Sequence, residues 1–521
     1  MKRALLVLAV FFGATCATAS AQDSRSIVEA AAAHMGATNL KTIQITGSGF
    51  TAAFGQSYRL TDDFPRFEVP AYTKVIDYEG RASREEYTRR QGSYPPVGGG
   101  FTPLQGESRT VALVNGNFAW SMDGANVIPQ PGKYLAGMPI AEARQLEIIM
   151  TPHGFLKAAL ASPTLNSITQ RYAGTVTDGT TDNWRQATVV SITALGKYRV
   201  NGTINDRNEV ELVTTWIPTP SYGDTIYEIR YINYKDFGGV RFPTVLHSHI
   251  GDPIFNQAHN TFDVQVSDVK ANVPMPAMTV PEAVKTATVP PVRAAAQKLV
   301  EGVYLIGGGS HNSVAVEFKD FITVIEAPLD EERSLAVIEA VTKTIPNKEI
   351  RYVVNTHHHF DHSGGLRTYV SQGTVVVATP ANLEFYRTVM LYPMPRTLQP
   401  DRMAIFAPMN TNNRSPWLME PVHGRYVISD GMRTLELHPV AGNPHAVGML
   451  MAYLPAEKIL INADLFTPPA PNAPMPAATP SMRNLMTNIR RLKLDVAQHV
   501  PLHGAPGPHE ALVKIAGGGG Q

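Results

Sequence analysis

The hexapeptide 357–362, His-His-His-Phe-Asp-His, contains four potential metal ligands in the pattern His-x-His-x-Asp-His. It follows an apolar run that predicts the end of a strand. Residues two apart on an extended segment point the same way, so His357 and His359 can approach one ion. A turn after them lets Asp361 and His362 approach a second ion. Imidazole and carboxylate groups suit zinc, or iron and manganese where oxygen ligands dominate, so this segment predicts a metal site.

Three further candidate ligands lie downstream of the hexapeptide. His445 follows a turn sequence, Gly-Asn-Pro, whereas Asp464 and His503 each end a short apolar run. Loops that follow strands commonly carry the sites of α/β proteins. A lone histidine after a strand is more often structural, but the order of these three residues after the hexapeptide makes them candidates for one shared site.

This order of residues closely resembles the metallo-β-lactamase-fold superfamily of metal-dependent hydrolases, over about residues 296–510. The resemblance implies an αββα sandwich for the C-terminal half of an α+β chain. It also implies two metal ions, expected to be zinc. The implied ligands are His357, His359 and His445 for the first ion, and Asp361, His362 and His503 for the second, with Asp464 bridging both.

One position departs from the family pattern. Glu326 stands at the end of an apolar strand where the family usually has an aspartate, which questions its contact behind the ligands. Glu326, Thr356 and His358 are the candidates to orient the ligand rings. Strand alternation should point His358 away from its neighbours. Among the remaining histidines, His311 is the best candidate for a substrate contact.

The ligand set predicts a hydrolase that needs no serine or cysteine nucleophile. Two ions a few Å apart can share a bridging water and lower its pKa to about 7. Asp361 can orient the resulting hydroxide and pass its proton to the leaving group. The acidic bridge Asp464 resembles the esterase, lactonase and thioesterase branches, so an ester, lactone or amide substrate is expected. Alternatives are a β-lactam-hydrolysing enzyme or a phosphodiesterase on the same site. A periplasmic carrier or sensor for a lipid-like ligand, with a structural metal domain, is the alternative of another class.

Composition and charge narrow the partners and the cellular compartment. A net charge of +1 gives no electrostatic reason to expect nucleic acid as a partner, so a small-molecule substrate is expected. Residues 1–21 have the pattern of a cleavable secretory signal, with cleavage expected after Ala21. The only cysteine, Cys16, lies inside that segment. Export without disulfides fits a periplasmic or secreted protein, and no second apolar stretch approaches membrane-spanning length.

The 521 residues are too many for one ordinary core, so two domains are expected. Residues 22–270 show short β runs separated by turn residues, including a hairpin over 198–216, after one alanine-rich helix at 26–35. They predict a mainly antiparallel β domain. Residues 271–295 are proline-rich and predict a linker to the hydrolase domain at 296–521.

Within the C-terminal domain, the sequence predicts strands at 302–306, 314–318, 321–326 and 350–355, and a helix at 331–344. The segments 391–420 and 466–480 carry prolines and large apolar residues without regular periodicity. They are expected either to contact a hydrophobic part of the substrate or to pack against the N-terminal domain.

Overall fold

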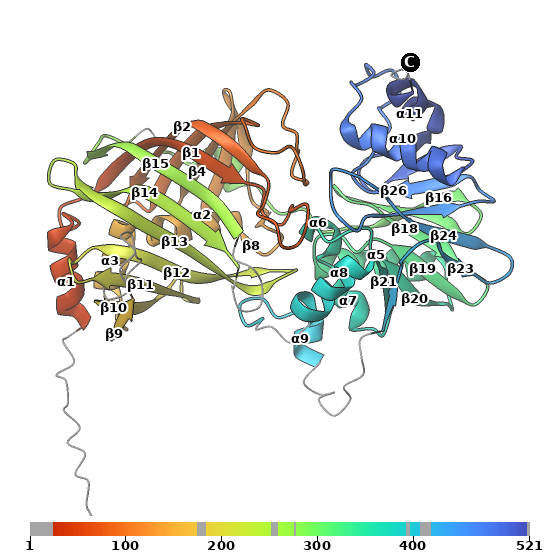
Figure 1. Ribbon diagram of the computed structural model, residues 1–521. Helices are drawn as coiled ribbons and strands as arrows, with labels where there is room; N and C mark the ends of the chain where they lie inside the picture. The colour runs from red at the N-terminus through yellow and green to blue at the C-terminus, as the bar shows by residue number, and fades with distance from the viewer. Residues whose placement is uncertain are drawn as a thin grey trace, which may run out of the picture.

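A computed structural model describes residues 24–173, 184–251, 259–275, 278–391, 396–406 and 418–517. The predicted signal segment and residues 392–395 and 407–417 of the segment 391–420 lie outside these residues. The described chain forms two bodies that lie side by side, an N-terminal one coloured red to yellow-green and a C-terminal one coloured green to blue (Figure 1). Among the described helices, none has the length and hydropathy of a membrane span.

The N-terminal body is built on one antiparallel sheet of 13 strands in the order β6-β5-β4-β3-β2-β1-β15-β14-β13-β12-β11-β10-β9. Its strands are β1 (Thr42–Ala52), β2 (Arg66–Asp77), β3 (Ala82–Arg90), β4 (Glu107–Asn115), β5 (Phe118–Asp123), β6 (Asn126–Pro129), β9 (Asn166–Ala173), β10 (Trp184–Ala194), β11 (Tyr198–Asn205), β12 (Val210–Thr219), β13 (Gly223–Asp236), β14 (Arg241–Ile250) and β15 (His259–Ala271). A separate small ribbon pairs β7 (Lys133–Tyr134) with β8 (Met138–Pro139).

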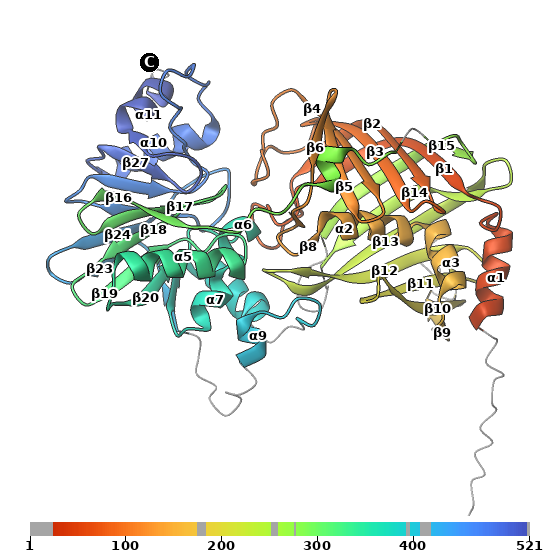
Figure 2. The ribbon, with the colours of Figure 1, turned by 180° about the vertical axis from the view of Figure 1, so that it is seen from behind.

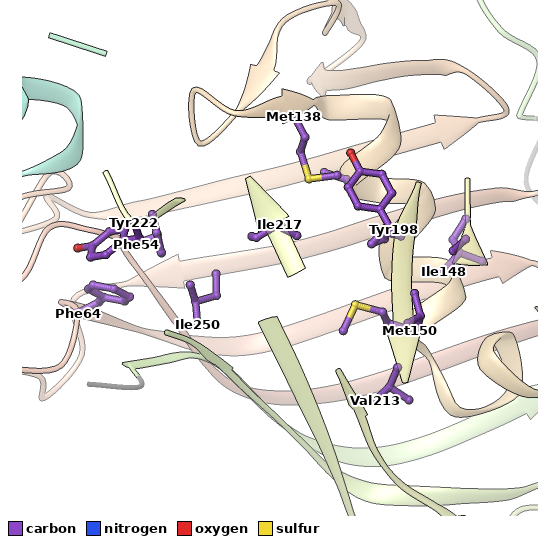
Figure 3. Packing of buried hydrophobic residues seen from close by; sticks show 14 of the residues in the cluster. Phe54, Phe64, Met138, Ile148, Met150, Tyr198, Val213, Ile217, Tyr222 and Ile250 are labelled. Atoms are coloured by element: carbon purple, nitrogen blue, oxygen red, sulfur yellow. The ribbon is translucent and has the colours of Figure 1, made fainter. Parts of the chain in front are cut away.

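Helices pack into the curve of this sheet. Helices α2 (Ile140–Met150) and α3 (Pro152–Ala161) lie against the strands, and α1 (Ser24–His34) packs beside α3 at the end of this body (Figure 2). The helices bury Met150 and Phe155 completely. Gly202 of β11 leaves room for the Phe155 ring, since a Cβ there would lie 2.1 Å from it. Figure 3 shows the same core, with Met150 beside strand residues such as Val213. The core therefore lies inside the curved sheet.

The C-terminal body contains two sheets packed face to face. The first has seven strands: β16 (Ala295–Val300), β17 (Val303–Gly307), β18 (Ser313–Glu317), β19 (Phe321–Ile325), β20 (Glu349–Val354), β21 (Val375–Ala378) and β22 (Met419–Pro421). The second has six: β23 (Tyr426–Ser429), β24 (Thr434–Pro439), β25 (Leu450–Leu454), β26 (Ile459–Asn462), β27 (Gln498–Pro501) and β28 (Gly507–Pro508).

Buried aliphatic residues from both sheets form one cluster between them, with Val316 and Ile325 from one sheet and Leu437 and Leu460 from the other. Helices cover the outer faces of the two sheets (Figure 1). These helices are α5 (Glu331–Thr344), α6 (Phe360–Ser363), α7 (Leu366–Val370), α8 (Pro380–Phe385), continued by a π-helical turn (Tyr386–Met390), α9 (Arg402–Phe406), α10 (Pro480–Leu492) and α11 (His509–Ala516). The expected αββα sandwich and antiparallel β domain are confirmed.

The sequence predicted several elements well and missed others. The predicted helix at 331–344 is α5, which Asp330 caps through a hydrogen bond from the Arg333 backbone N–H. The predicted hairpin is β11 and β12. The sequence analysis did not predict α2 and α3, or the strand β16 before the expected first strand of the C-terminal body. The N-terminal strands are also longer than the short runs expected, up to 14 residues in β13.

The described part of the proline-rich segment 271–295 contains one short helix, α4 (Glu282–Lys285), between the end of β15 and the start of β16. It is not free of contacts, because Met278 and Val284 are buried against strands of the N-terminal sheet. The backbone carbonyl of Met278 also accepts a hydrogen bond from Asn115. The segment therefore packs along the N-terminal body before β16 begins.

Candidate metal centre

The hexapeptide lies where strand β20 ends and the short helix α6 begins. Its first three histidines occupy the loop, and Asp361 and His362 lie in the single turn of α6. The two glycines that follow have ordinary helical φ values of −59° and −92°. Their small size matters instead, because a Cβ at Gly364 or Gly365 would lie 2.0 Å from an oxygen atom of the preceding loop or of α5. The glycines allow close packing of α6 against this neighbouring segment.

The first predicted set of ligands converges. His357 Nε2 and His359 Nδ1 are 2.9 Å apart. Asp464 Oδ2 lies 3.3 Å from His357 Nε2 and 3.1 Å from His445 Nε2. His445 Nε2 is buried and has no hydrogen-bond partner. Three ring nitrogens and one carboxylate oxygen thus face a common point, as zinc coordination requires.

The second predicted set lies beside the first and shares Asp464 with it. Asp464 Oδ2 is 2.9 Å from His362 Nε2, and its Oδ1 is 3.0 Å from His503 Nε2. The Nε2 atoms of His362 and His503 are 3.0 Å apart. Asp361 Oδ2 lies 3.8 Å from His362 Nε2. All seven predicted residues therefore come together, and Asp464 lies between the two groups.

Most of these rings are held from behind through the nitrogen that faces away from the centre. Three of these contacts come from the C-terminal body: Thr356 Oγ1 to His357 Nδ1 at 3.0 Å, Glu326 Oε2 to His362 Nδ1 at 2.9 Å, and the Ser310 carbonyl to His503 Nδ1 at 3.2 Å. Such contacts fix the ring orientation and the tautomer, and leave the other nitrogen free for a metal ion. The donor set therefore fits two divalent ions.

Glu326 departs from the family pattern, but it does contact a ligand ring from behind, that of His362. It is completely buried, and it accepts hydrogen bonds from Asn355 Nδ2, Thr356 N, Thr356 Oγ1 and His362 Nδ1. Glu326 and Asp464 both adopt positive φ, at 79° and 55°. Strained backbone of this kind is common at functional sites, where the surroundings hold it in place.

Two other histidines of the sequence analysis are also located. His311 lies in the centre itself, because its Nε2 is 3.2 Å from Asp361 Oδ2 and its ring packs on that of His503. With Asp361, His362 and His503 it forms a group whose ligand atoms lie within 4.8 Å of one another. The sequence analysis considered His311 only for substrate contact. His358 is buried beside the centre and donates through Nε2 to the Ser57 carbonyl.

The electrostatics of the centre suit cation binding. Burial, together with neighbouring histidines, lowers the pKa of His357 and His359 well below the usual value, so these rings are neutral and can act as ligands. Burial alone would raise the pKa of Asp361 and Asp464, but nearby His362 outweighs it and holds both carboxyl groups ionised. Burial would also lower the pKa of His362, but Asp464 and Asp361 raise it well above its ordinary value. His362 would therefore have to release a proton before it could hold a metal ion.

The apolar loops differ in their surroundings. In segment 391–420, Leu391 and Met403 are buried in a cluster that also contains residues of the N-terminal body. In segment 466–480, Phe466 is buried against the His499 ring, whereas Met475 is exposed. Of the described residues, the first segment is therefore core only in part, since Ile405 and Leu418 are exposed, and the second also leaves an apolar side chain on the surface.

A family model described as "Metallo-beta-lactamase superfamily" matches residues 306–497. A protein named linear primary-alkylsulfatase, from Pseudomonas sp, is 32% identical over 79 residues, which are 15% of this chain and 12% of that protein. The chain therefore spans only a small part of that relative.

Solved structures similar to this chain include three metallo-beta-lactamases. They are DIM-1 (16% identity, TM-score 0.32, 43% of this chain and 96% of that one), the enzyme from Pontibacter korlensis (19%, 0.32, 43% and 98%) and the mono-zinc form of FIM-1 from Pseudomonas aeruginosa (20%, 0.30, 43% and 94%).

Proposed function

Residues 306–497 belong to the metallo-beta-lactamase superfamily of metal-dependent hydrolases, and on this basis we propose that the protein is an exported binuclear zinc hydrolase. Its proposed substrate is an ester, lactone or amide of a small, partly hydrophobic molecule. The observation that carries this proposal is the convergence of six ligand residues on both oxygens of Asp464 and on one another.

The proposed ligands are those that the sequence indicated. His357, His359 and His445 would hold one ion, Asp361, His362 and His503 the other, and Asp464 both. Bound divalent ions supply Lewis acidity, which makes water nucleophilic near neutral pH and polarises a carbonyl oxygen. The centre also contains no competing nucleophile from cysteine, because the only cysteine of the chain is Cys16.

Asp361 is the proposed catalytic residue. Its carboxylate accepts hydrogen bonds on both oxygens, from Gln56 Nε2 at 2.8 Å and from His311 Nε2 at 3.2 Å. These contacts fix the orientation of the carboxylate beside His362. An ionised carboxylate in that position can take a proton from the attacking water and deliver it to the leaving atom.

Sulfate esters are a further candidate substrate within the ester class. The short similarity to a protein named as an alkylsulfatase supports sulfate esters of alkyl chains as substrates to be tested beside carboxylic esters.

Metal analysis and a substrate panel test the proposal. The full chain without its signal segment should contain close to two zinc ions, and a chelator should abolish its activity. The panel comprises chromogenic carboxylic esters, lactones, amides, alkyl sulfates, cephalosporins and phosphodiesters. Turnover of a cephalosporin or a phosphodiester alone would replace the proposed substrate class with that alternative. Folded protein that binds no zinc would contradict the hydrolase and support a carrier or sensor.

Export and the division into domains belong to the same proposal. We assign residues 1–21 to a cleaved signal, 22–270 to the β domain, 271–295 to the connecting segment and 296–521 to the hydrolase domain. Cell fractionation followed by N-terminal sequencing tests the first assignment. A mature chain that begins at Gln22 in the periplasm or the medium is the expected result, and an uncleaved cytoplasmic chain would contradict it.

A further inference from the structure

The segment that follows strand β1 reaches from the N-terminal body into the metal centre. The Ser57 carbonyl accepts a hydrogen bond from His359 Nε2 at 3.0 Å. One residue earlier, Gln56 is buried, and its Nε2 donates to Asp361 Oδ1 at 2.8 Å. Two proposed ligands, one for each ion, are thus contacted by residues about 300 positions away in the chain.

The orientation of the Gln56 amide follows from a second contact. Its Oε1 accepts a hydrogen bond from the Gly100 backbone N–H at 3.0 Å. A backbone N–H can only donate, so the oxygen of the amide must face Gly100 and the NH₂ group must face Asp361. Because Asp361 Oδ1 can only accept while it is ionised, this contact is a directed donor–acceptor pair.

The surrounding packing leaves little freedom for this segment. A Cβ at Gly55 would lie 2.7 Å from the Phe360 ring, and one at Gly99 would lie 2.8 Å from His359 Cε1. Backbone hydrogen bonds join the two bodies on either side, from Gly98 N to the Pro444 carbonyl and from Val447 N to the Tyr58 carbonyl. Figures 1 and 2 both show α6 facing the N-terminal sheet.

We propose that the N-terminal domain completes the hydrolytic centre and that Gln56 is a positioning residue for Asp361. This inference rests on the proposed function of the centre. Gln56 holds one carboxylate oxygen and His311 holds the other, so the plane of the carboxylate is fixed from both sides. Without the Gln56 donor, Asp361 loses half of this restraint and presents its lone pairs less accurately to the second ion and to water.

The test compares Gln56→Glu with Gln91→Ala in the full chain. Gln56→Glu keeps the side-chain volume and an oxygen for Gly100, but it replaces the donor to Asp361 by an acceptor. Gln91 is the matched control, because it holds the loop that contains Gly100, through the Tyr94 carbonyl and the Leu104 N–H, and these hydrogen bonds do not involve the metal centre. If Gln56 only stabilised the surrounding loops, Gln91→Ala would lower the zinc affinity at least as much as Gln56→Glu does.

The expected result for Gln56→Glu is a fall of about 10- to 100-fold in the affinity for the more weakly bound Zn²⁺. The measurement is competition with a chromogenic chelator, which needs no substrate and is therefore independent of the proposed activity. A fall in kcat with little change in KM should accompany it. Unchanged zinc affinity in folded Gln56→Glu would overturn the positioning role. Absence of zinc binding in the parent would instead overturn the proposed function. Gln56→Ala, which removes the donor without adding charge, should show the same direction.

A different observation concerns the outer face of strand β14, outside the metal centre. His247 and His249 stand two residues apart on this strand, and their Nε2 atoms are 3.0 Å apart. Each Nδ1 is paired with its own carboxylate, Asp263 Oδ2 at 2.8 Å and Glu228 Oε1 at 3.0 Å. The carboxylates are themselves held, by Gln265 and Arg230.

The positions of the protons make this pair unusual. A carboxylate only accepts hydrogen bonds, so each Nδ1 carries its hydrogen. Hydrogen bonds from the two rings outweigh the effect of burial and keep the pKa of Asp263 and of Glu228 below the usual range. With both Nδ1 atoms donating, the two Nε2 atoms face each other at 3.0 Å, so they must share one cation, either a proton or a metal ion. A metal ion bound by both Nε2 atoms would satisfy both lone pairs, and the spacing is close to the 2.9 and 3.0 Å of the ligand pairs in the metal centre.

We propose that His247 and His249 form a second, independent site for one transition-metal ion such as Zn²⁺ or Cu²⁺, completed by water. Imidazoles whose second nitrogen is held by a carboxylate are typical metal ligands. With only two protein ligands the ion should bind more weakly than in the C-terminal centre.

Titration of the metal-free full chain with Zn²⁺, followed by calorimetry, tests this site. The parent should bind one more equivalent than His247→Gln, and His34→Gln, which changes an exposed histidine at the end of α1, should behave as the parent. Loss of the same equivalent in His249→Gln would support the assignment. Equal stoichiometry in parent and both variants would overturn it, and would mean that a shared proton is the cation between the rings.

Discussion

Replacement of Glu326 by glutamine separates the contribution of a residue behind the ligands from that of the ligands themselves. The carboxylate accepts four hydrogen bonds, two on each oxygen. Oε1 accepts from Asn355 Nδ2 and from the Thr356 backbone N–H, and neither donor can reverse its role. The amide oxygen of a glutamine must therefore occupy the Oε1 position, and its NH₂ group must occupy the position of Oε2.

The NH₂ group then faces Thr356 Oγ1 and His362 Nδ1. The hydroxyl can rotate and accept, but His362 Nδ1 can accept only if its proton moves to Nε2. Nε2 is the atom that faces Asp464 at 2.9 Å and that would bind the second ion. Glu326→Gln thus favours the tautomer of His362 that cannot act as a ligand.

The expected effect is a loss of about 10- to 100-fold in affinity for the second zinc ion, which corresponds to about 1.4 to 2.7 kcal/mol. Calorimetric titration of the metal-free protein measures it, and the first ion should be affected less. Glu209→Gln is the control for a buried carboxylate, since Glu209 is paired with Arg241 in the N-terminal body. Two unchanged binding events in folded Glu326→Gln would refute the argument from tautomers.

Three further predictions concern catalysis, metal removal and pH. Asp361→Ala should lower kcat by about 100-fold or more, with an unchanged far-UV circular dichroism spectrum; activity within severalfold of the parent would exclude the proposed role. Removal of zinc should lower the Tm of the C-terminal domain by about 5 to 10 °C in calorimetry, because a ligand at 100 times its Kd stabilises the folded state by about 2.7 kcal/mol. An unaltered Tm would contradict the binding of zinc to the folded domain. Burial lowers the pKa of His153 to about 4, and its Nδ1 has no hydrogen-bond partner. In the unfolded chain the pKa of this histidine is near 6.5, so the unfolded chain binds the proton at a higher pH than the folded chain does. The contribution of neutral His153 to stability is therefore complete above about pH 6.5, and about 3 kcal/mol of it is lost as the pH falls toward 4. His153→Gln should reduce this loss in urea titrations at pH 7 and pH 4.5, and an equal loss in both proteins would exclude His153 as its source.

Local patterns in the sequence were sufficient where a structural feature depends on neighbouring residues. The apolar period predicted helix α5 at about its observed bounds, and the structure adds the Asp330 cap. The turn around Asn208, at a φ of 59°, separates the two strands of the predicted hairpin. Helix α2 was missed although Ala143, Leu146 and Met150 repeat at helical spacing and are buried, so its signal was present in the sequence.

The sequence by itself determined the identity and order of the seven ligand-type residues, because they stand in a dense motif, after a turn or at a strand end, and local pattern reveals each of these. Only the tertiary structure decided which groups lie behind them. Glu326 reaches His362 from the next strand, His311 enters from the loop after β17, and Gln56 and Ser57 come from another body about 300 residues away. Such contacts have no local sequence signal, because they depend on how distant segments pack after the chain has folded.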